Sequence, residues 1–77
     1  MTREVFPGIT VDSATLHGRP VIGGTRVPVE AILGELAGGS SYEEVMEDYH
    51  LTKEQLYAAL GYAAQMLSST TIYVPGE

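Results

Sequence analysis

The period of the apolar residues changes at Pro28, and this change limits what the chain can fold into. The first third of the sequence is rich in β-branched residues and turn formers, which is typical of short strands. From residue 29 onward the apolar residues follow the i, i+3, i+4, i+7 spacing of a helix with one buried face. These residues are Val29, Ile32, Leu33, Leu36 and Ala37. The sequence therefore predicts a small β region followed by a helix over about 28–37, in which Pro28 occupies the first position.

Two further helices are predicted by the residues at their starts. Ser40 or Ser41 stands three residues before a glutamate, and either pair can form a capping box for a helix over about 41–49. The apolar face of this helix would comprise Tyr42, Val45, Met46 and Tyr49. Thr52 and Gln55 form another capping box, which begins a helix over about 53–67. Its inward stripe would comprise Leu56, Ala59, Leu60, Ala63 and Leu67, with Leu51 packed on Leu56 as a hydrophobic staple.

The β region is expected to contain a strand and a hairpin within residues 5–27. Phe6 to Val11 can extend as a strand, and Gly23-Gly24 can form the tight turn of a hairpin over residues 20–27. A β-prone tail follows the last helix at residues 72–74. With no internal repeat and no linker, we expect one domain over residues 1–77. The predicted fold is mainly α, a small tri-helical helix-turn-helix (winged-helix-like) domain with an N-terminal β-hairpin.

Composition excludes several classes of function. The 77 residues include no cysteine, so a disulfide-stapled secreted scaffold is excluded and a reducing, cytoplasmic location is expected. No signal peptide or membrane span is recognisable. His17 and His50 form no ligand motif, and Ser40 and Ser41 are explained as caps. We therefore expect no metal, no cofactor and no enzymatic activity.

The charge of the chain favours a basic partner over nucleic acid. Ten acidic residues oppose four basic ones, for a formal net charge of -6. DNA is bound largely by neutralising its phosphates, so the isolated chain is expected to bind duplex DNA weakly. Complementary potential instead favours association with a basic protein.

The second and third helices have the proportions of a helix-turn-helix, in which the later helix reads DNA. The DNA contacts would then come from Thr52, Lys53, Gln55 and Tyr57. The outward face of the third helix carries few charges and is interpreted first as a protein-contact surface. It comprises Glu54, Ala58, Gly61 and Gln65. Glycine weakens a helix, so Gly61 suggests that another helix approaches closely.

Particular sequence motifs resemble one known family. They are Gly18-Arg19-Pro20-Val21-Ile22-Gly23-Gly24-Thr25-Arg26-Val27-Pro28-Val29, Ile32-Leu33, Leu36-Ala37-Gly38, Ser40, Glu43-Glu44-Val45, Tyr49, Leu51-Thr52, Ala58-Ala59-Leu60 and Tyr62-Ala63-Ala64. Over about residues 8–67 the chain is similar to domain-of-unknown-function family 433, a group of antitoxin-like, VapB-type helix-turn-helix proteins. The resemblance implies a DNA-binding-like fold and an antitoxin role, often beside a PIN-like nuclease. Relatives commonly carry proline where this chain has His50, and their turn is often one residue longer.

Three functions remain open from the sequence. The first is a type II antitoxin that neutralises a PIN-like nuclease toxin and binds operator DNA as a complex. The others are a stand-alone homodimeric transcriptional regulator and a structural adapter. Partner-binding candidates are Arg19, Arg26, Ala58, Gly61, Gln65, Ile72, Tyr73 and Val74. Arg26 could enter a nuclease site or only pair with Glu30. Because the domain is small, we also expect it to self-associate as a homodimer.

Overall fold

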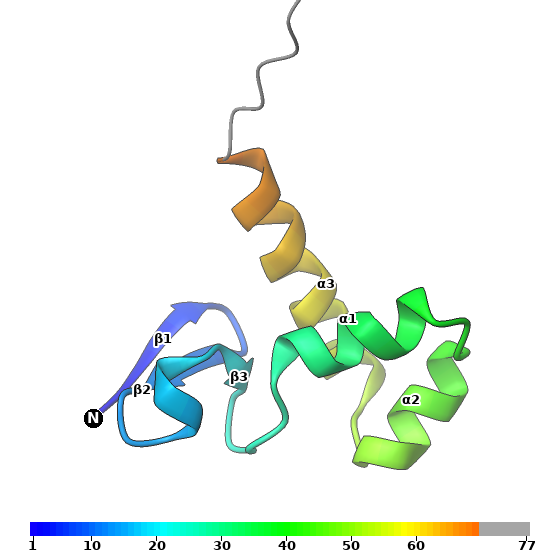
Figure 1. Cartoon of the computed structure of the whole chain (residues 1–77), viewed down its shortest axis with the longest axis horizontal. Helices are drawn as coiled ribbons and strands as arrows, with labels where there is room; N and C mark the ends of the chain where they lie inside the picture. The colour runs from blue at the N-terminus through cyan, green and yellow to red at the C-terminus, as the bar shows by residue number, and fades with distance from the viewer. Residues whose placement is uncertain (70–77) are drawn as a thin grey trace, which may run out of the picture.

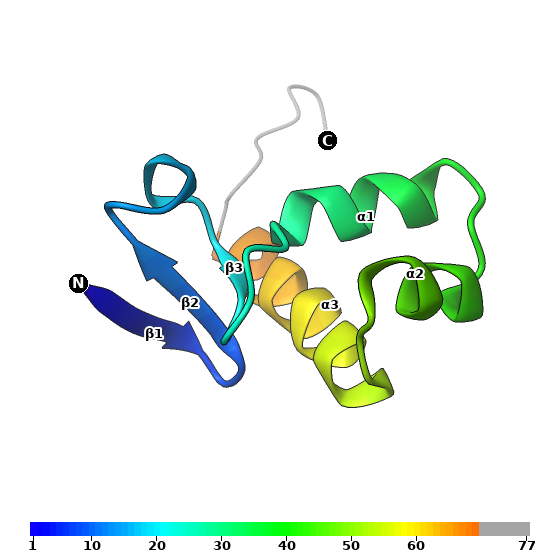
Figure 2. The ribbon, with the colours of Figure 1, turned by 90° about the horizontal axis from the view of Figure 1, so that it is seen from below.

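The computed structural model describes residues 1–69, which form a three-stranded antiparallel sheet followed by three helices (Figure 1). The sheet has the order β1-β2-β3 and is formed by β1 (Thr2–Phe6), β2 (Ile9–Asp12) and β3 (Val21–Ile22), with a short 3-10 turn, η1 (Leu16–Gly18), before β3. The helices are α1 (Val29–Ala37), α2 (Tyr42–Tyr49) and α3 (Lys53–Ser68). In Figure 2, the sheet lies on the left and α2 on the right, and α1 runs above α3 between them. The predicted β-prone tail at 72–74 lies outside the described residues.

The helices begin and end within one residue of the predicted bounds. A small, mainly helical domain with an N-terminal β element is therefore correct as a fold class, while the winged-helix-like arrangement stays a prediction. Both capping boxes form. The backbone N–H of Glu44 donates to Ser41 Oγ at 3.1 Å, and that of Gln55 donates to Thr52 Oγ1 at 3.1 Å. Ser41, not Ser40, is the cap of α2.

The continuous strand predicted from Phe6 to Val11 is wrong. Pro7 and Gly8 make a turn that divides it into the paired strands β1 and β2, with Arg3 opposite Val11. Proline cannot donate to a ladder hydrogen bond, and Gly8 has a φ of +86°, which glycine adopts without strain. The Pro-Gly pair is a turn signal that the sequence interpretation overlooked.

The Gly23-Gly24 turn is present, although only its first arm is a strand. The N–H of Thr25 donates to the Ile22 carbonyl at 3.0 Å, and Val21 forms an isolated bridge with Pro28. The Gly23 N–H donates to the Gly8 carbonyl at 2.8 Å, and a side chain on Gly23 would meet that carbonyl at 3.3 Å. Gly23 thus allows two turns to touch.

The core contains side chains from the sheet and from all three helices. The largest fully buried side chains are Ile9, Ile22, Ile32, Val45 and Leu56. Leu51 is 7% exposed and packs with Leu56 in the same cluster, as expected for the staple. The helical stripes are shorter than predicted, because Tyr42 is 45% exposed and Leu67 is 70% exposed. Ala37 is exposed as well.

The chain reverses between α2 and α3 at His50, which has a φ of 57° in the left-handed region. The Leu51 N–H donates to the Met46 carbonyl at 2.9 Å and closes the helix end. A proline ring holds φ near about −65°, so proline could not adopt this conformation. A proline at position 50 would therefore be incompatible with the turn seen in this chain.

The capping carboxylate of Glu44 should make helix α2 sensitive to acid. Hydrogen bonds from the Ser41 backbone, and then from its side chain, lower the pKa of Glu44 below its ordinary value. A lowered folded-state pKa gives stability that is complete above the unfolded pKa and is lost as pH falls through the folded one. Glu44→Gln, which keeps a capping oxygen, should make unfolding less dependent on pH below about 5. Urea unfolding followed by circular dichroism across this range tests this, and Glu43→Gln is the matched control. An equal flattening in both variants would contradict the assignment.

Candidate functional site

Helix α2 carries an exposed acidic face, defined by Glu43, Glu44, Glu47 and Asp48. The pairs 43/47 and 44/48 have i, i+4 spacing, at which like charges destabilise a helix. No residue of α2 is basic, and among residues 1–69 none of these carboxylates forms a salt bridge. Glu43 and Glu44 lie in the first turn, where negative charge suits the helix dipole, but the stability of the helix does not account for Glu47 and Asp48.

The same charge affects the predicted DNA contacts. The unit formed by α2 and α3 contains five carboxylates, on the acidic face and at Glu54, against the single cation of Lys53. Thr52 and Gln55 use their side chains in the capping box, whereas Lys53 and Tyr57 are exposed. Because DNA is bound largely by neutralising its phosphates, the excess of carboxylates on this unit opposes contact with DNA.

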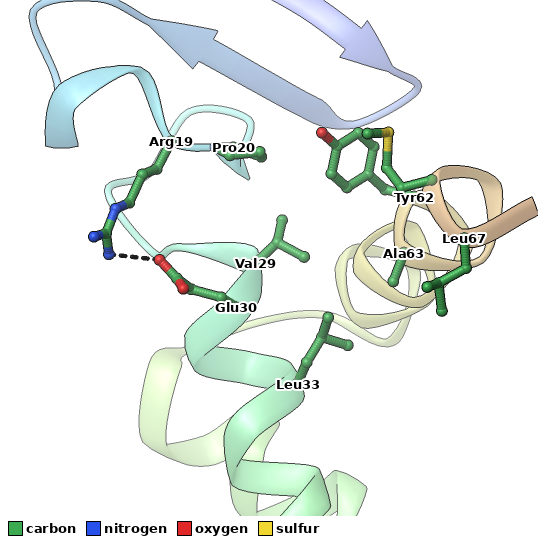
Figure 3. Close-up of a pocket in the computed structure, with 9 residues that line it drawn as sticks. Arg19, Pro20, Val29, Glu30, Leu33, Tyr62, Ala63 and Leu67 are labelled. Atoms are coloured by element: carbon green, nitrogen blue, oxygen red, sulfur yellow. Dashed lines mark hydrogen bonds and ion pairs between the residues drawn. The ribbon is translucent and has the colours of Figure 1, made fainter. Parts of the chain in front are cut away.

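An apolar groove of about 580 Å³ lies between α1 and the C-terminal half of α3 (Figure 3). Val29 and Leu33 of α1 face Ala63 and Leu67 of α3 across it. Its remaining lining residues are Arg19, Pro20, Glu30, Tyr62 and Met66. Arg19 Nη1 and Glu30 Oε1 are 2.6 Å apart at the rim, and both side chains are exposed. The groove is therefore an apolar surface with a charge-balanced edge.

The two candidate arginines have different surroundings. The sequence interpretation paired Glu30 with Arg26 as one alternative, but the structure pairs it with Arg19. Arg19 lies between η1 and β3 and faces the first turn of α1, where Glu30 lies. Arg26 is exposed, and within the described part of the chain it has no ion-pair partner.

The face of α3 containing Ala58 and Gly61 is not the open surface that was expected. A side chain on Gly61 would lie 3.0 Å from Cζ of Phe6, and one on Gly8 would lie 3.2 Å from Cβ of Ala58. The close approach inferred at Gly61 is thus real, but it comes from the β1–β2 hairpin and not from another helix. Gln65 is exposed, and Ile72, Tyr73 and Val74 lie outside the described residues.

A polar cluster joins α1 to α2 and involves Glu35. Tyr49 Oη donates to Glu35 Oε2 at 3.2 Å, and Ser40 Oγ donates to Glu35 Oε1 at 3.3 Å. Partial burial, and then the charge of Glu35, raise the pKa of Tyr49. Both oxygens of this carboxylate accept hydrogen bonds: the one from Tyr49 ties α2 to α1, and the one from Ser40 holds the loop between these helices. Among residues 1–69 no group of three or more His, Asp or Glu side chains is placed to hold a metal ion.

The sequence interpretation missed the groove, although one signal was available. From Gln55 to Ser69 the chain has no charged residue, which is unusual for a helix exposed at its end. Tyr62 and Met66 were assigned to no surface, and Leu67 was assigned to the core. Helical spacing shows which residues share a face, but it does not show where neighbouring elements stop covering that face.

No helix of the described chain has the length and apolar character needed to cross a membrane.

The fold defines a small three-helix domain with an N-terminal sheet, and its prominent features are two outer surfaces, one acidic and one apolar. The chain belongs to the family described as "Protein of unknown function (DUF433)", whose profile matches residues 9–63. It is 36% identical over 52 residues to a Mycobacterium tuberculosis protein named "Putative antitoxin VapB45". The crystal structure of Rv2018 from Mycobacterium tuberculosis is similar, with a TM-score of 0.61 and 36% identity.

The present chain is much shorter than both relatives. Each similarity covers 68% of this chain, but only 22% of the named antitoxin and 24% of the crystallised protein. The shared part corresponds to one module of a longer protein.

Proposed function

We propose that this chain is an antitoxin module, a non-enzymatic regulatory protein that binds a basic toxin through the acidic face of α2. The observation that carries the proposal is the uncompensated charge of this face, which contains two like-charged i, i+4 pairs and has no ion-pair partner within residues 1–69. The similarity to a protein named as an antitoxin supports the same role. The cognate toxin would be a PIN-like nuclease, as the family resemblance implies.

The exposed arginine has a specific place in this proposal. A PIN-like site is a cluster of carboxylates around a divalent metal, and a guanidinium inserted there would compete with the metal. Arg26 follows the rigid Gly23-Gly24 turn and is unpaired within the described residues, whereas Arg19 is already paired with Glu30. Arg26 is therefore the better candidate for blocking the toxin.

DNA binding fits the proposal only as a property of the complex. A basic toxin would offset the acidic face, and two or more modules in one assembly would combine modest DNA contacts into higher avidity. Lys53 and Tyr57 are the exposed candidates for those contacts. The stand-alone regulator and the purely structural adapter receive less support, because neither explains the acidic face.

Co-expression with the adjacent open reading frame, which this proposal expects to encode the nuclease, tests the proposal. The chain should restore growth and co-purify with the nuclease, while Glu47→Lys with Asp48→Lys should weaken binding by at least about 10-fold through lost charge complementarity. Glu4→Lys with Glu54→Lys changes the net charge equally and is the matched control. Arg26→Ala should retain binding but lose neutralisation. No growth rescue by the wild-type chain, or equal weakening by both double variants, would contradict the proposal.

A further inference from the structure

We infer that the apolar groove between α1 and α3 is the interface through which two copies of this chain pair. In this pairing, Leu67 of each copy enters the groove of the other, and Arg19 of each copy faces Glu30 of the other. The inference does not depend on the antitoxin role, because it concerns only the chain itself.

The groove region provides both a hollow and exposed apolar side chains that could fill the same hollow on a second copy of the chain. Leu67 is 70% exposed and Met66 is 50% exposed, and both line the groove. Figure 1 shows the last turns of α3 extending beyond the sheet and the other two helices. A two-fold interface uses the same patch on both subunits, so that patch must be self-complementary. A protruding helix end beside an apolar groove meets this requirement.

Charge selects a second copy over a basic partner at this surface. Two chains with a formal charge of -6 repel each other, so two copies are expected to meet where their surface carries little charge. Residues 55–69 form the longest stretch of the helical region without a charge. The rim carries one cation, Arg19, and one anion, Glu30, which a copy of the same rim complements. A basic protein is better matched by the acidic face of α2, and no residue of α2 lines the groove.

The rim pair can be exchanged between copies at little cost. In the single chain both side chains are more than half exposed, at 62% for Arg19 and 65% for Glu30. Exposed ion pairs contribute little to stability because water and salt screen them. Replacing the Arg19–Glu30 contact within one chain by the reciprocal contacts between two copies therefore costs little stability. The reciprocal contacts also fix how the two copies are aligned.

Sedimentation equilibrium of the full chain gives the first test. The wild-type chain should show a concentration-dependent monomer–dimer equilibrium, and Leu67→Glu should raise the dimer dissociation constant by at least about 10-fold, because a charge would be buried without a partner. Tyr42→Glu is the matched control, since Tyr42 is also exposed and apolar but lies on α2 outside the groove. It should leave the dissociation constant within about 2-fold of the wild-type value.

Mixing two charge variants gives a sharper test. Arg19→Glu leaves two anions at the rim and Glu30→Arg leaves two cations, so each variant alone should dimerise less than the wild type. Mixed in equal amounts, they should form a heterodimer, because both reciprocal contacts are then between opposite charges. A pair that acts only within one chain would give no such rescue. Circular dichroism of each variant checks that it folds.

Three results would overturn the inference. The first is a wild-type chain that stays monomeric at high micromolar concentration. The second is a dimer that Leu67→Glu leaves unchanged, and the third is a mixture of the charge variants that forms no heterodimer. Loss of nuclease binding in Leu67→Glu, with a monomeric wild type, would assign the groove to that partner instead. Whichever of these results is obtained, nuclease binding by the charge variants of α2 is a separate measurement. The proposed antitoxin role is therefore tested separately.

Discussion

Leu56→Ala is expected to lower the free energy of unfolding by about 2–5 kcal/mol, whereas Leu67→Ala should change it by less than about 0.5 kcal/mol. The two leucines lie on the same helix about three turns apart, and helical spacing places both on one stripe. Leu56 is fully buried in the core cluster, and Leu67 is 70% exposed. A domain of this size has only about 3–5 kcal/mol of core stability, so the Leu56 variant should be largely unfolded.

Urea unfolding followed by circular dichroism measures both changes, at concentrations low enough to keep the chain monomeric. This condition separates folding from any pairing through the groove. Ala59, which is also fully buried, gives a second core position, and Ala59→Ser should destabilise the chain by placing a hydroxyl in an apolar site. Equal losses for the Leu56 and Leu67 variants would show that the end of α3 is packed, contrary to the structure.

Gly61→Val is expected to destabilise the chain by about 1–3 kcal/mol, the usual cost of overfilling a packed site. An added Cβ would lie 3.0 Å from Cζ and 3.2 Å from Cε2 of Phe6, so the ring would have to move. That ring also makes an edge-to-face contact with Tyr62, with centroids 6.1 Å apart and planes at 66°, and movement would disturb this contact. The loss outweighs the gain in helix propensity when glycine is replaced.

Gly34→Val is the matched control for this change. Gly34 also lies inside a helix, but a Cβ there would meet no atom within 4 Å. The control should be neutral or slightly stabilising, since only helix propensity changes. Phe6→Ala combined with Gly61→Val should cost less than the sum of the two single changes, because the first removes the atoms that clash. Additive costs in this double-mutant cycle, measured by urea unfolding, would rule out the Phe6 contact as the cause.

The helices could be predicted from the sequence because their signals are local. Each capping box needs only residues three apart, and the hydrogen bonds of Ser41 with Glu44 and of Thr52 with Gln55 follow from that spacing. The change of apolar period at Pro28 likewise required no knowledge of distant residues. The same reasoning could have placed the turn at Pro7-Gly8, which is also a local signal.

The surroundings of Gly61 and Glu30 could not be predicted from the sequence, because they depend on contacts between residues distant in the chain. Gly61 could be recognised as a site of close approach, but only the tertiary structure shows that Phe6, 55 positions earlier in the chain, makes that approach. Glu30 could be paired with a nearby arginine by sequence, but the path of the chain before β3 brings Arg19 to it and leaves Arg26 exposed.

The sequence by itself determined where the helices begin and end, the excess of negative charge and the family. The tertiary structure decided which parts of each apolar stripe are covered. Periodicity fixes the direction of a side chain around its helix, whereas burial requires that another element lie against that direction. Helix α3 is longer than the elements packed along it, so its stripe is core at Leu56 and exposed surface at Leu67.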